Sequence, residues 1–243
     1  HAVHFGYSGS VGPQKWGSLS PSYAACDGKS QSPVNIVQKQ AVLNKNLKPL
    51  TRSYAPVNAT LRNHGTAIDV KYETSPGWVT VWGKKYLLAQ MHWHSPSEHT
   101  IDGQSYPLEL HLVHKASDGN ITVIGILYKY GDSDPIVEKL EKGLKKLAKE
   151  GKKHEEPQIP LGVIDTKQLK RNTRKYYRYA GSLTTPPCSE IVTWNLLGKV
   201  RTVSKRQVEL LKAPLKREFQ KNARPTQPLN GRKIELFKKT DDQ

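Results

Sequence analysis

Residues 86–94 read YLLAQMHWH and residues 107–115 read PLELHLVHK, and these two stretches hold four of the nine histidines in the chain. Both are rich in apolar and aromatic residues, which is typical of β-strands. Histidine is polar and titratable, and burying it without a partner costs free energy. The histidines therefore need partners, and the geometry of a strand indicates which partners are available.

Side chains on a strand alternate between its two faces, so Leu88, Gln90, His92 and His94 share one face of the first stretch. An antiparallel neighbour would bring His111 of the second stretch opposite the pair His92 and His94. Three neutral imidazoles with an open fourth position are typical of a catalytic zinc site. We therefore predict that these three histidines bind one zinc ion, and a set of hydrogen-bonded core histidines is the alternative.

Two polar residues accompany the predicted ligands. Gln90 and Glu109 lie on the ligand face, each two residues before a ligand. Each can accept a hydrogen bond from the second ring nitrogen of a ligand and so fix its tautomer. His99 and His114 fit the ligand pattern less well, and His114 points to the opposite face. We predict a hydrogen-bonded core histidine at His114.

The remaining sequence predicts a β-dominated (α+β) fold in a single domain, residues 1–243. Short apolar or alternating stretches are separated by turn residues such as Asp102-Gly103 and Asp118-Gly119. They indicate further strands at 57–62, 66–73, 78–82, 121–130, 176–181 and 190–195.

Two helices are also indicated, at the periphery of the sheet. One begins after Asp134 with Pro135 in its first position, and Gly151 can end it. The other begins at Ser204, where Gln207 completes a capping box. In both helices the apolar residues fall on one face.

The formal net charge of +17 indicates affinity for polyanions. The basic residues are scattered, however, and glutamates accompany the lysines in the densest segment, 138–156, EKLEKGLKKLAKEGKKHEE. This pattern favours a solvated basic surface without specific nucleic-acid recognition, and weak polyanion binding is the alternative. No apolar run approaches the ~20 residues of a membrane span, so none is expected.

Cys26 and Cys188 are the only cysteines, and neither belongs to a C-x-x-C motif. They are either two free thiols or one long-range disulfide. The sequons at Asn58 and Asn120 favour the disulfide and a secretory route. The first ten residues, HAVHFGYSGS, contain no apolar segment like that of a signal peptide.

Several motifs follow one another over nearly the whole chain: QSPVNI (31–36), QMHWHSPSEHTIDG (90–103), ELHLVH (109–114), GSLTTPPCSEIVTW (181–194) and NARPTQPLNGRKI (222–234). In this combination the chain resembles the α-class carbonic anhydrases. The segment KYYRYAGSLTTPPCSE (175–190) most resembles the plant branch. The resemblance implies a large, twisted, mostly antiparallel central sheet with zinc at the base of a conical cleft. It also implies reversible hydration of carbon dioxide to bicarbonate and a proton.

The resemblance further implies roles that residue patterns alone do not give. Thr184 matches the hydroxyl that accepts the proton of the zinc-bound hydroxide, and Glu98 matches the carboxylate that accepts the Thr184 proton. Cys26 and Cys188 match a disulfide of secreted members, which would hold the Thr184 loop. The residues that match the wall and lining of the cleft are Tyr7, Gln90, Val113, Val123, Leu183, Thr185 and Val192.

The chain departs from the family at the proton shuttle. Efficient members carry a histidine directly after the glycine of an N-G-H segment, whereas residues 61–70 here read LRNHGTAIDV. Thr66 therefore follows the glycine, and His64 precedes it. On a strand the two would face the same side, so His64 would line the cleft and partly replace the shuttle. The alternative is a surface histidine without a role.

We thus expect a zinc hydro-lyase (carbonate dehydratase) with one zinc per chain, acting on carbon dioxide and bicarbonate. The alternatives are a vegetative storage protein or a basic polyanion-binding protein on the same scaffold. The expected location is extracellular, in the apoplast, or in a plastid reached through the secretory pathway.

Overall fold

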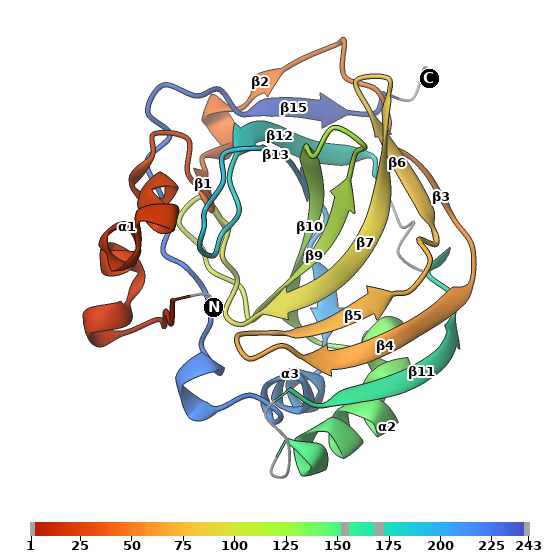
Figure 1. The fold of residues 1–243 in the computed structure, drawn as a ribbon. Coiled ribbons are helices and arrows are strands. Elements are labelled where there is room, and N and C mark those ends of the chain that lie inside the picture. Colours follow the sequence, from red (N-terminus) through yellow and green to blue (C-terminus); the bar gives the residue numbers. More distant parts are fainter. Residues whose placement is uncertain (1–2, 152–155, 168–172, 241–243) are drawn as a thin grey trace.

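A large twisted sheet forms the body of the protein in a computed structural model that describes residues 3–151, 156–167 and 173–240 (Figure 1). Among these residues the sheet has 13 strands. They are β2 (Val42–Leu43), β3 (Thr51–Tyr54), β4 (Val57–Asn63), β5 (Ile68–Tyr72), β6 (Gly77–Val81), β7 (Lys84–His94), β9 (Leu108–Lys115), β10 (Ile121–Tyr130), β11 (Gln158–Ile164), β12 (Lys175–Gly181), β13 (Val192–Leu197), β14 (Arg201–Val203) and β15 (Glu235–Lys238).

The strands follow the order β11-β4-β5-β7-β9-β10-β13-β12-β15-β2, with β14 beside β10, and with β6 between β7 and β3. Neighbours are antiparallel except β10 with β13, β10 with β14, and β15 with β2. A separate parallel pair joins β1 (Asn35–Ile36) to β8 (Thr100–Ile101). The predicted β-dominated, mostly antiparallel fold is confirmed.

The predicted strands are all present, and their observed ends differ from the predicted ends by a few residues. The sequence did not indicate β11, which contains Pro160 and Gly162 and pairs with β4 through an irregular register. Proline and glycine weaken the strand signal, and both are tolerated here because β11 is an edge strand. The strands β1, β2, β3, β8, β14 and β15 were also missed, because two to four residues are too few to show a period.

The register between β7 and β9 decides which side chains face the same way as the predicted ligands. His92 pairs with His111 and Gln90 pairs with Val113, but the register shifts between Leu88 and Gln90. Such a bulge adds one residue to β7 and reverses the face of every side chain before it.

The prediction that Leu88 shares the ligand face was therefore wrong. Leu88 pairs with His114 and is fully buried, on the core side with Met91. Its neighbour Leu87 takes the ligand side instead, opposite Lys115, and is 51% exposed.

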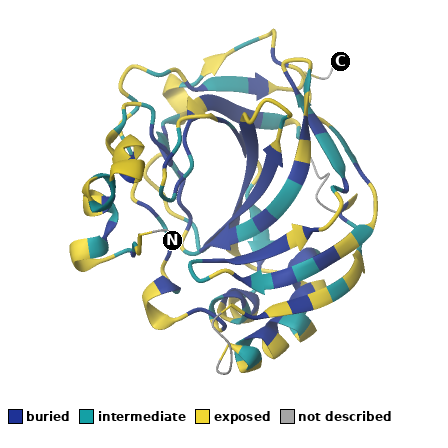
Figure 2. Ribbon diagram, viewed as in Figure 1, coloured by how far each residue is buried: buried dark blue, intermediate teal, exposed yellow. Residues whose placement is uncertain are grey.

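The larger apolar core lies between the sheet and the helices α2 (Pro135–Glu150) and α3 (Lys205–Lys212). Leu110 and Leu112 of β9 pack there with Leu140 and Leu144 of α2 and Leu211 of α3. Figure 2 shows the buried positions concentrated in the central strands and the exposed ones on the outer helices and loops. This core fixes the back of β7 and β9, so that their other faces are held rigidly.

Both helices begin as predicted. The Asp134 carboxylate accepts the backbone N–H groups of Ile136 and Val137, each at 3.0 Å, and Ser204 and Gln207 form the capping box of α3. No helix among the described residues has the length and apolar character needed to cross a bilayer.

A disulfide joins Cys26 to Cys188, which settles the question that the sequence left open. Cys26 lies in a 3₁₀ helix, η3 (Pro21–Asp27), which follows the short helix α1 (Trp16–Leu19). Cys188 lies in the loop between β12 and β13, the loop that also carries Thr184. The N-terminal segment is thereby tied to that loop, as the resemblance implied.

Candidate metal centre and cleft

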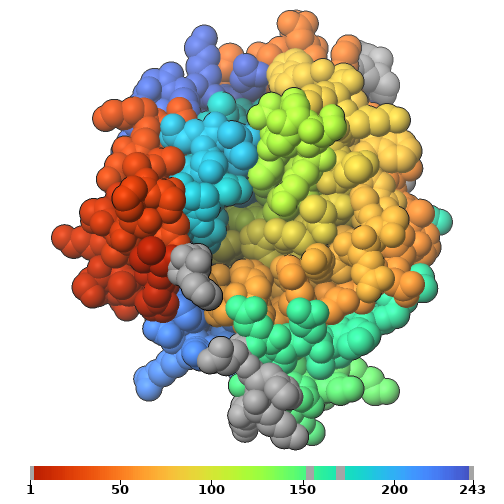
Figure 3. Space-filling view, viewed as in Figure 1, coloured from red at the N-terminus to blue at the C-terminus, as the bar shows by residue number. Residues whose placement is uncertain are grey.

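A hollow opens near the centre of the face shown in Figure 3, between segments that are far apart in sequence. Its volume is about 230 Å³. Strands β7, β9, β10 and β13, the turn between β4 and β5, and the loop between β12 and β13 all contribute to it. The lining residues are His64, Thr66, Ala67, Gln90, His92, His94, His111, Val113, Lys115, Ile121, Val123, Leu183, Thr184, Thr185 and Trp194.

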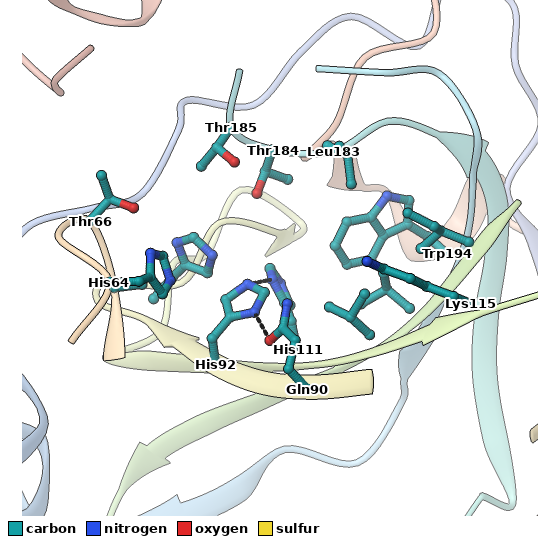
Figure 4. Close-up of a pocket in the computed structure, with 15 residues that line it drawn as sticks. His64, Thr66, Gln90, His92, His111, Lys115, Leu183, Thr184, Thr185 and Trp194 are labelled. Carbon is teal, nitrogen blue, oxygen red and sulfur yellow. Dashed lines mark hydrogen bonds between the residues drawn. The ribbon is translucent and has the colours of Figure 1, made fainter. Parts of the chain in front are cut away.

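The three predicted ligands meet at the base of this cavity (Figure 4). Strand β7 supplies His92 and His94 at alternate positions, and β9 supplies His111 directly opposite His92. The ring centroids are 5.0 Å apart for His92 and His94, 5.1 Å for His92 and His111, and 4.8 Å for His94 and His111. One nitrogen from each ring lies within 4.8 Å of the others. The structure thus brings the predicted trio together.

Two of the rings are oriented by the polar residues that the sequence indicated. His92 Nδ1 lies 2.8 Å from Gln90 Oε1, and His111 Nε2 is hydrogen-bonded to Glu109 Oε2. Because carboxylate and amide oxygens only accept, the histidine nitrogens donate in these bonds. The proton of each ring is therefore on the nitrogen that makes this bond, and the other ring nitrogen presents a lone pair.

The third ring is oriented by a group that sequence reasoning missed. His94 Nδ1 lies 2.7 Å from the backbone oxygen of Asn222, and so donates to it. The Asn222 side chain in turn accepts the N–H of Ser95 and donates to the backbone oxygen of Thr66. Asn222 belongs to the NARPTQPLNGRKI motif. The backbone oxygen of any residue can accept a hydrogen bond, however, so the residue types of the motif do not indicate this role.

The nitrogens left over by these bonds face one another without hydrogens between them. His111 Nδ1 lies 3.3 Å from His92 Nε2, and His94 Nε2 is buried without a hydrogen-bond partner. Two bare lone pairs at this distance repel each other, whereas a cation between them would be bound by both. Nitrogens held at 2.0–2.1 Å from a tetrahedral zinc lie about 3.3 Å apart. The donor set therefore fits zinc.

The surroundings of His92 and His94 favour neutral imidazoles, the form that binds metal. Burial lowers the pKa of His92 well below its usual value, and the neighbouring His94 and His111 add to this effect. Burial also lowers the pKa of His94. At His111 burial acts in the same direction, but the Glu109 carboxylate outweighs it and raises the pKa.

Glu109 is a fully buried carboxylate that holds several groups at once. Its Oε1 accepts the backbone N–H groups of Glu98 at 3.0 Å and His99 at 2.8 Å, and its Oε2 accepts from His99 Nδ1 and from His111. Burial acts to raise the pKa of Glu109, but His99 and His111 lower it well below the usual range. His99, which fitted the ligand pattern poorly, thus supports a ligand through Glu109, and its Nε2 lies 2.6 Å from the Tyr179 hydroxyl.

Glu98 is buried beside two of the predicted ligands, His94 and His111. Its Oε2 accepts the backbone N–H of Arg224 at 2.9 Å, while its Oε1 has no hydrogen-bond partner and lies 3.3 Å from His94 Nε2. Thr184 lines the cavity and is 6% exposed. The hydrogen bond predicted between Thr184 and Glu98 stays a prediction, and Oε1 is the acceptor available for it.

Arg224 was not singled out in the sequence, yet it connects three segments near the site. Its guanidinium donates to the side chain of Gln31 and to the backbone oxygens of Ser32 and Cys26. It is nearly fully buried, and these bonds replace part of the water that it loses, since its Nε has no hydrogen-bond partner. The arrangement fixes the backbone N–H that holds Glu98.

One wall of the cavity is apolar. Of the residues that the resemblance assigned to the cleft, Val113, Val123, Leu183 and Thr185 line the cavity, whereas Val192 is buried in the apolar cluster behind it. Lining residues that were not predicted are Ala67, Lys115, Ile121 and Trp194.

Tyr7 is not among the lining residues of the cavity. Its ring packs edge-on against Trp16, with centroids 5.6 Å apart, and its hydroxyl is buried without a hydrogen-bond partner. Burial raises the pKa of Tyr7 well above its usual value, and the nearby Glu98 carboxylate adds to this effect. The structure therefore places Tyr7 beside Glu98 rather than on the cavity surface.

His64 and Thr66 both line the cavity, but for a different reason from the one predicted. They lie in the turn between β4 and β5, outside either strand. Gly65, between them, has a φ of +100°, which glycine adopts without strain, and its N–H is bonded to the Asn63 side chain. His64 is exposed and stands on the opposite side of the cavity from Lys115 (Figure 4).

The acceptor residues of both sequons lie at the surface. Asn58 is exposed on β4, and Asn120 is exposed in the turn that leads into β10. Glycosylation at these positions stays a prediction.

The model of the eukaryotic-type carbonic anhydrase family matches residues 11–238. The chain belongs to this family. It is 43% identical to alpha carbonic anhydrase 7 of Arabidopsis thaliana over 228 residues, which cover 93% of this chain and 82% of that protein.

Solved structures support the same fold. The crystal structure of dioscorin complexed with ascorbate has a TM-score of 0.93 and 36% identity, covering 98% of this chain and 99% of that one. The α-carbonic anhydrase of Thermovibrio ammonificans, solved with the inhibitor sulfanilamide, has a TM-score of 0.85 and 40% identity, covering 97% and 100%.

Proposed function

We propose that this protein is a zinc-dependent hydro-lyase that interconverts carbon dioxide and bicarbonate. The observation that carries the proposal is the set of three bare imidazole nitrogens at the base of the cavity. Each is turned inward because the other nitrogen of its ring is bonded to Gln90, Glu109 or the Asn222 backbone. Fixed neutral ligands with an open approach are what a catalytic zinc requires.

When bound by three imidazoles, zinc acidifies water at its fourth position enough to supply hydroxide at neutral pH, a property of this family rather than a value measured on this chain. The residues around it direct that nucleophile. The Thr184 hydroxyl would donate to Glu98 Oε1, which leaves the Thr184 oxygen as an acceptor facing the cavity. Val113, Val123 and Leu183 would hold the apolar substrate and exclude water beside it.

Metal analysis combined with an activity assay tests the proposal. Purified protein should contain one zinc per chain, and its carbon dioxide hydration should disappear after chelation and return when zinc is added. Protein that contains one zinc per chain but does not hydrate carbon dioxide would contradict the catalytic role. Protein that neither contains nor takes up zinc would contradict the metal site itself.

The similarity to dioscorin makes storage the second candidate function. A chain used only for storage is free to lose a ligand or the groups that orient the nucleophile. Here His92, His94, His111, Glu98 and Thr184 are all present. The assay above separates the two functions, because a storage protein would show neither bound zinc nor activity.

Two further proposals concern ligands and location. The Thermovibrio ammonificans enzyme was solved in complex with the inhibitor sulfanilamide, and we therefore propose that the zinc-loaded site of this chain also binds aromatic sulfonamides. We also propose a secretory route, supported by the disulfide and by exposed Asn58 and Asn120. A mass decrease after peptide N-glycosidase treatment of the natural protein would support that route.

A further inference from the structure

Lys115 places a cation on the cavity wall that the proposed reaction does not use. It lies on β9 four residues after His111, and Val113 lies between them on the same face of the strand. Four residues span about 13 Å along a strand. Lys115 therefore lies well outside the metal centre, and in Figure 4 its side chain runs along the Trp194 side of the cavity, across from His64.

The charge of Lys115 is not neutralised by a neighbour. Among the described residues no carboxylate lies within ion-pair distance of Lys115, whereas Lys84 of the neighbouring strand β7 forms an ion pair with Asp118. The residues that line the cavity include four histidines and Lys115, and none of them is acidic. An anion that enters the cavity therefore meets no fixed negative charge on its surface.

Apolar side chains flank Lys115 on the same face. It pairs with Ile121 of β10 on one side and with Leu87 of β7 on the other. Leu87 is 51% exposed, and Ile191, whose backbone oxygen accepts the N–H of Ile121, is 41% exposed. A cation beside exposed apolar side chains matches an organic acid with an apolar body better than it matches a small inorganic ion.

We propose that Lys115, with Val113, Ile121 and Leu87, forms an outer subsite for the carboxylate of an elongated organic ligand whose other end is bound at the base of the cavity. The apolar body of such a ligand lies along Val113 and Ile121, and its acid group reaches the Lys115 ammonium. The cleft then selects anionic ligands over neutral ligands of the same shape. This inference rests on the proposed function, because the metal centre holds the inner end of the ligand.

Two matched sulfonamides test the subsite by binding rather than by activity. 4-Sulfamoylbenzoate carries a carboxylate at the outer end, and 4-sulfamoylbenzamide is its neutral counterpart. Their dissociation constants are measured by calorimetry on the zinc-loaded protein and on the Lys115→Gln variant. Lys129→Gln is the control, because exposed Lys129 lies on β10 away from the cavity and its loss lowers the net charge equally.

The wild type should bind the benzoate about threefold to fivefold more tightly than the benzamide, as expected for one partly exposed ion pair. Lys115→Gln should remove this preference by weakening the benzoate alone, and Lys129→Gln should keep it. Equal affinity for both ligands in the wild type, or a preference that survives in Lys115→Gln, overturns the subsite while leaving the proposed function intact. Failure of both ligands to bind overturns the metal centre and the subsite together.

Discussion

Burial of His114 should make the stability of the protein depend on pH. It lies on the core face of β9 and is fully buried. Its Nδ1 donates to the backbone oxygen of Leu112 at 2.9 Å, so its Nε2 accepts the Tyr54 hydroxyl at 2.6 Å. Burial lowers the pKa of His114 to about 3. The native state therefore keeps this imidazole neutral at any ordinary pH.

In the unfolded chain the same imidazole has a pKa of about 6.5. Between pH 6.5 and pH 3 the unfolded state binds a proton that the native state does not, so the free energy of unfolding falls as the pH falls. Each pH unit within this window costs about 1.4 kcal/mol. Between pH 7 and pH 5, His114 alone should lower the free energy of unfolding by about 2 kcal/mol.

Urea unfolding at pH 7 and pH 5 measures this effect when the wild type is compared with His114→Gln. The substitution should reduce stability at both pH values, because it disturbs a buried hydrogen bond and its packing. The quantity to compare is the change in the free energy of unfolding between pH 7 and pH 5 in each protein. The constant loss caused by the substitution does not enter this change, and other titrating groups contribute equally to it in both proteins. The wild type should lose about 2 kcal/mol more than the variant between pH 7 and pH 5.

Equal losses in the wild type and His114→Gln would refute the reasoning. They would mean that His114 accepts a proton in the native state near its usual pKa in spite of its burial. Substitution of the exposed His4 by glutamine provides the control for the loss of a histidine. This variant should follow the wild type at both pH values.

The remaining predictions concern the metal centre, the cavity and the disulfide. Glu109→Gln should weaken zinc binding about 10- to 100-fold in a chelator competition, and unchanged affinity would contradict its role in orienting His111. Thr184→Val should lower kcat/KM about 100-fold at unchanged zinc content, whereas Thr184→Ser should keep most of the activity. His64→Ala should slow turnover at low buffer concentration and recover at high concentration, and equal turnover at every concentration would exclude a proton-transfer role. Replacing both Cys26 and Cys188 by serine should lower the free energy of unfolding by about 2–5 kcal/mol in urea, and an unchanged midpoint would contradict a stabilising disulfide.

The sequence alone located the candidate ligands because strand alternation is a local rule. From Gln90 onward β7 is regular, so His92 and His94 fall on one face, and the apolar patterns of β7 and β9 are strong enough to indicate both strands. The rule failed at Leu88, because the bulge before Gln90 depends on the pairing with β9. The sequence of a single strand does not show that it contains one residue more than its partner at such a bulge.

Contacts between distant segments could not be predicted from local patterns. The backbone oxygen of Asn222 that orients His94 comes from 128 positions further along the chain. No residue pattern assigned a role to Glu98 or Thr184, and only the family resemblance did so. The position of Glu98 depends on a bond from the backbone N–H of Arg224, which lies 126 positions further along the chain.

The regular spacing of β9 separates the proposed metal centre from the proposed outer subsite. Along one face of this strand, Glu109 orients the His111 ring, His111 would offer a nitrogen to the proposed metal, Val113 forms part of the apolar wall and Lys115 stands at the outer end. Successive members of this series are about 7 Å apart. A substitution at Lys115 therefore acts about 13 Å from the ligand position and leaves the bonds of His111 untouched. Under these two proposals, a change of the outermost residue would alter which ligands the cleft prefers, while the innermost residues would keep the metal chemistry constant.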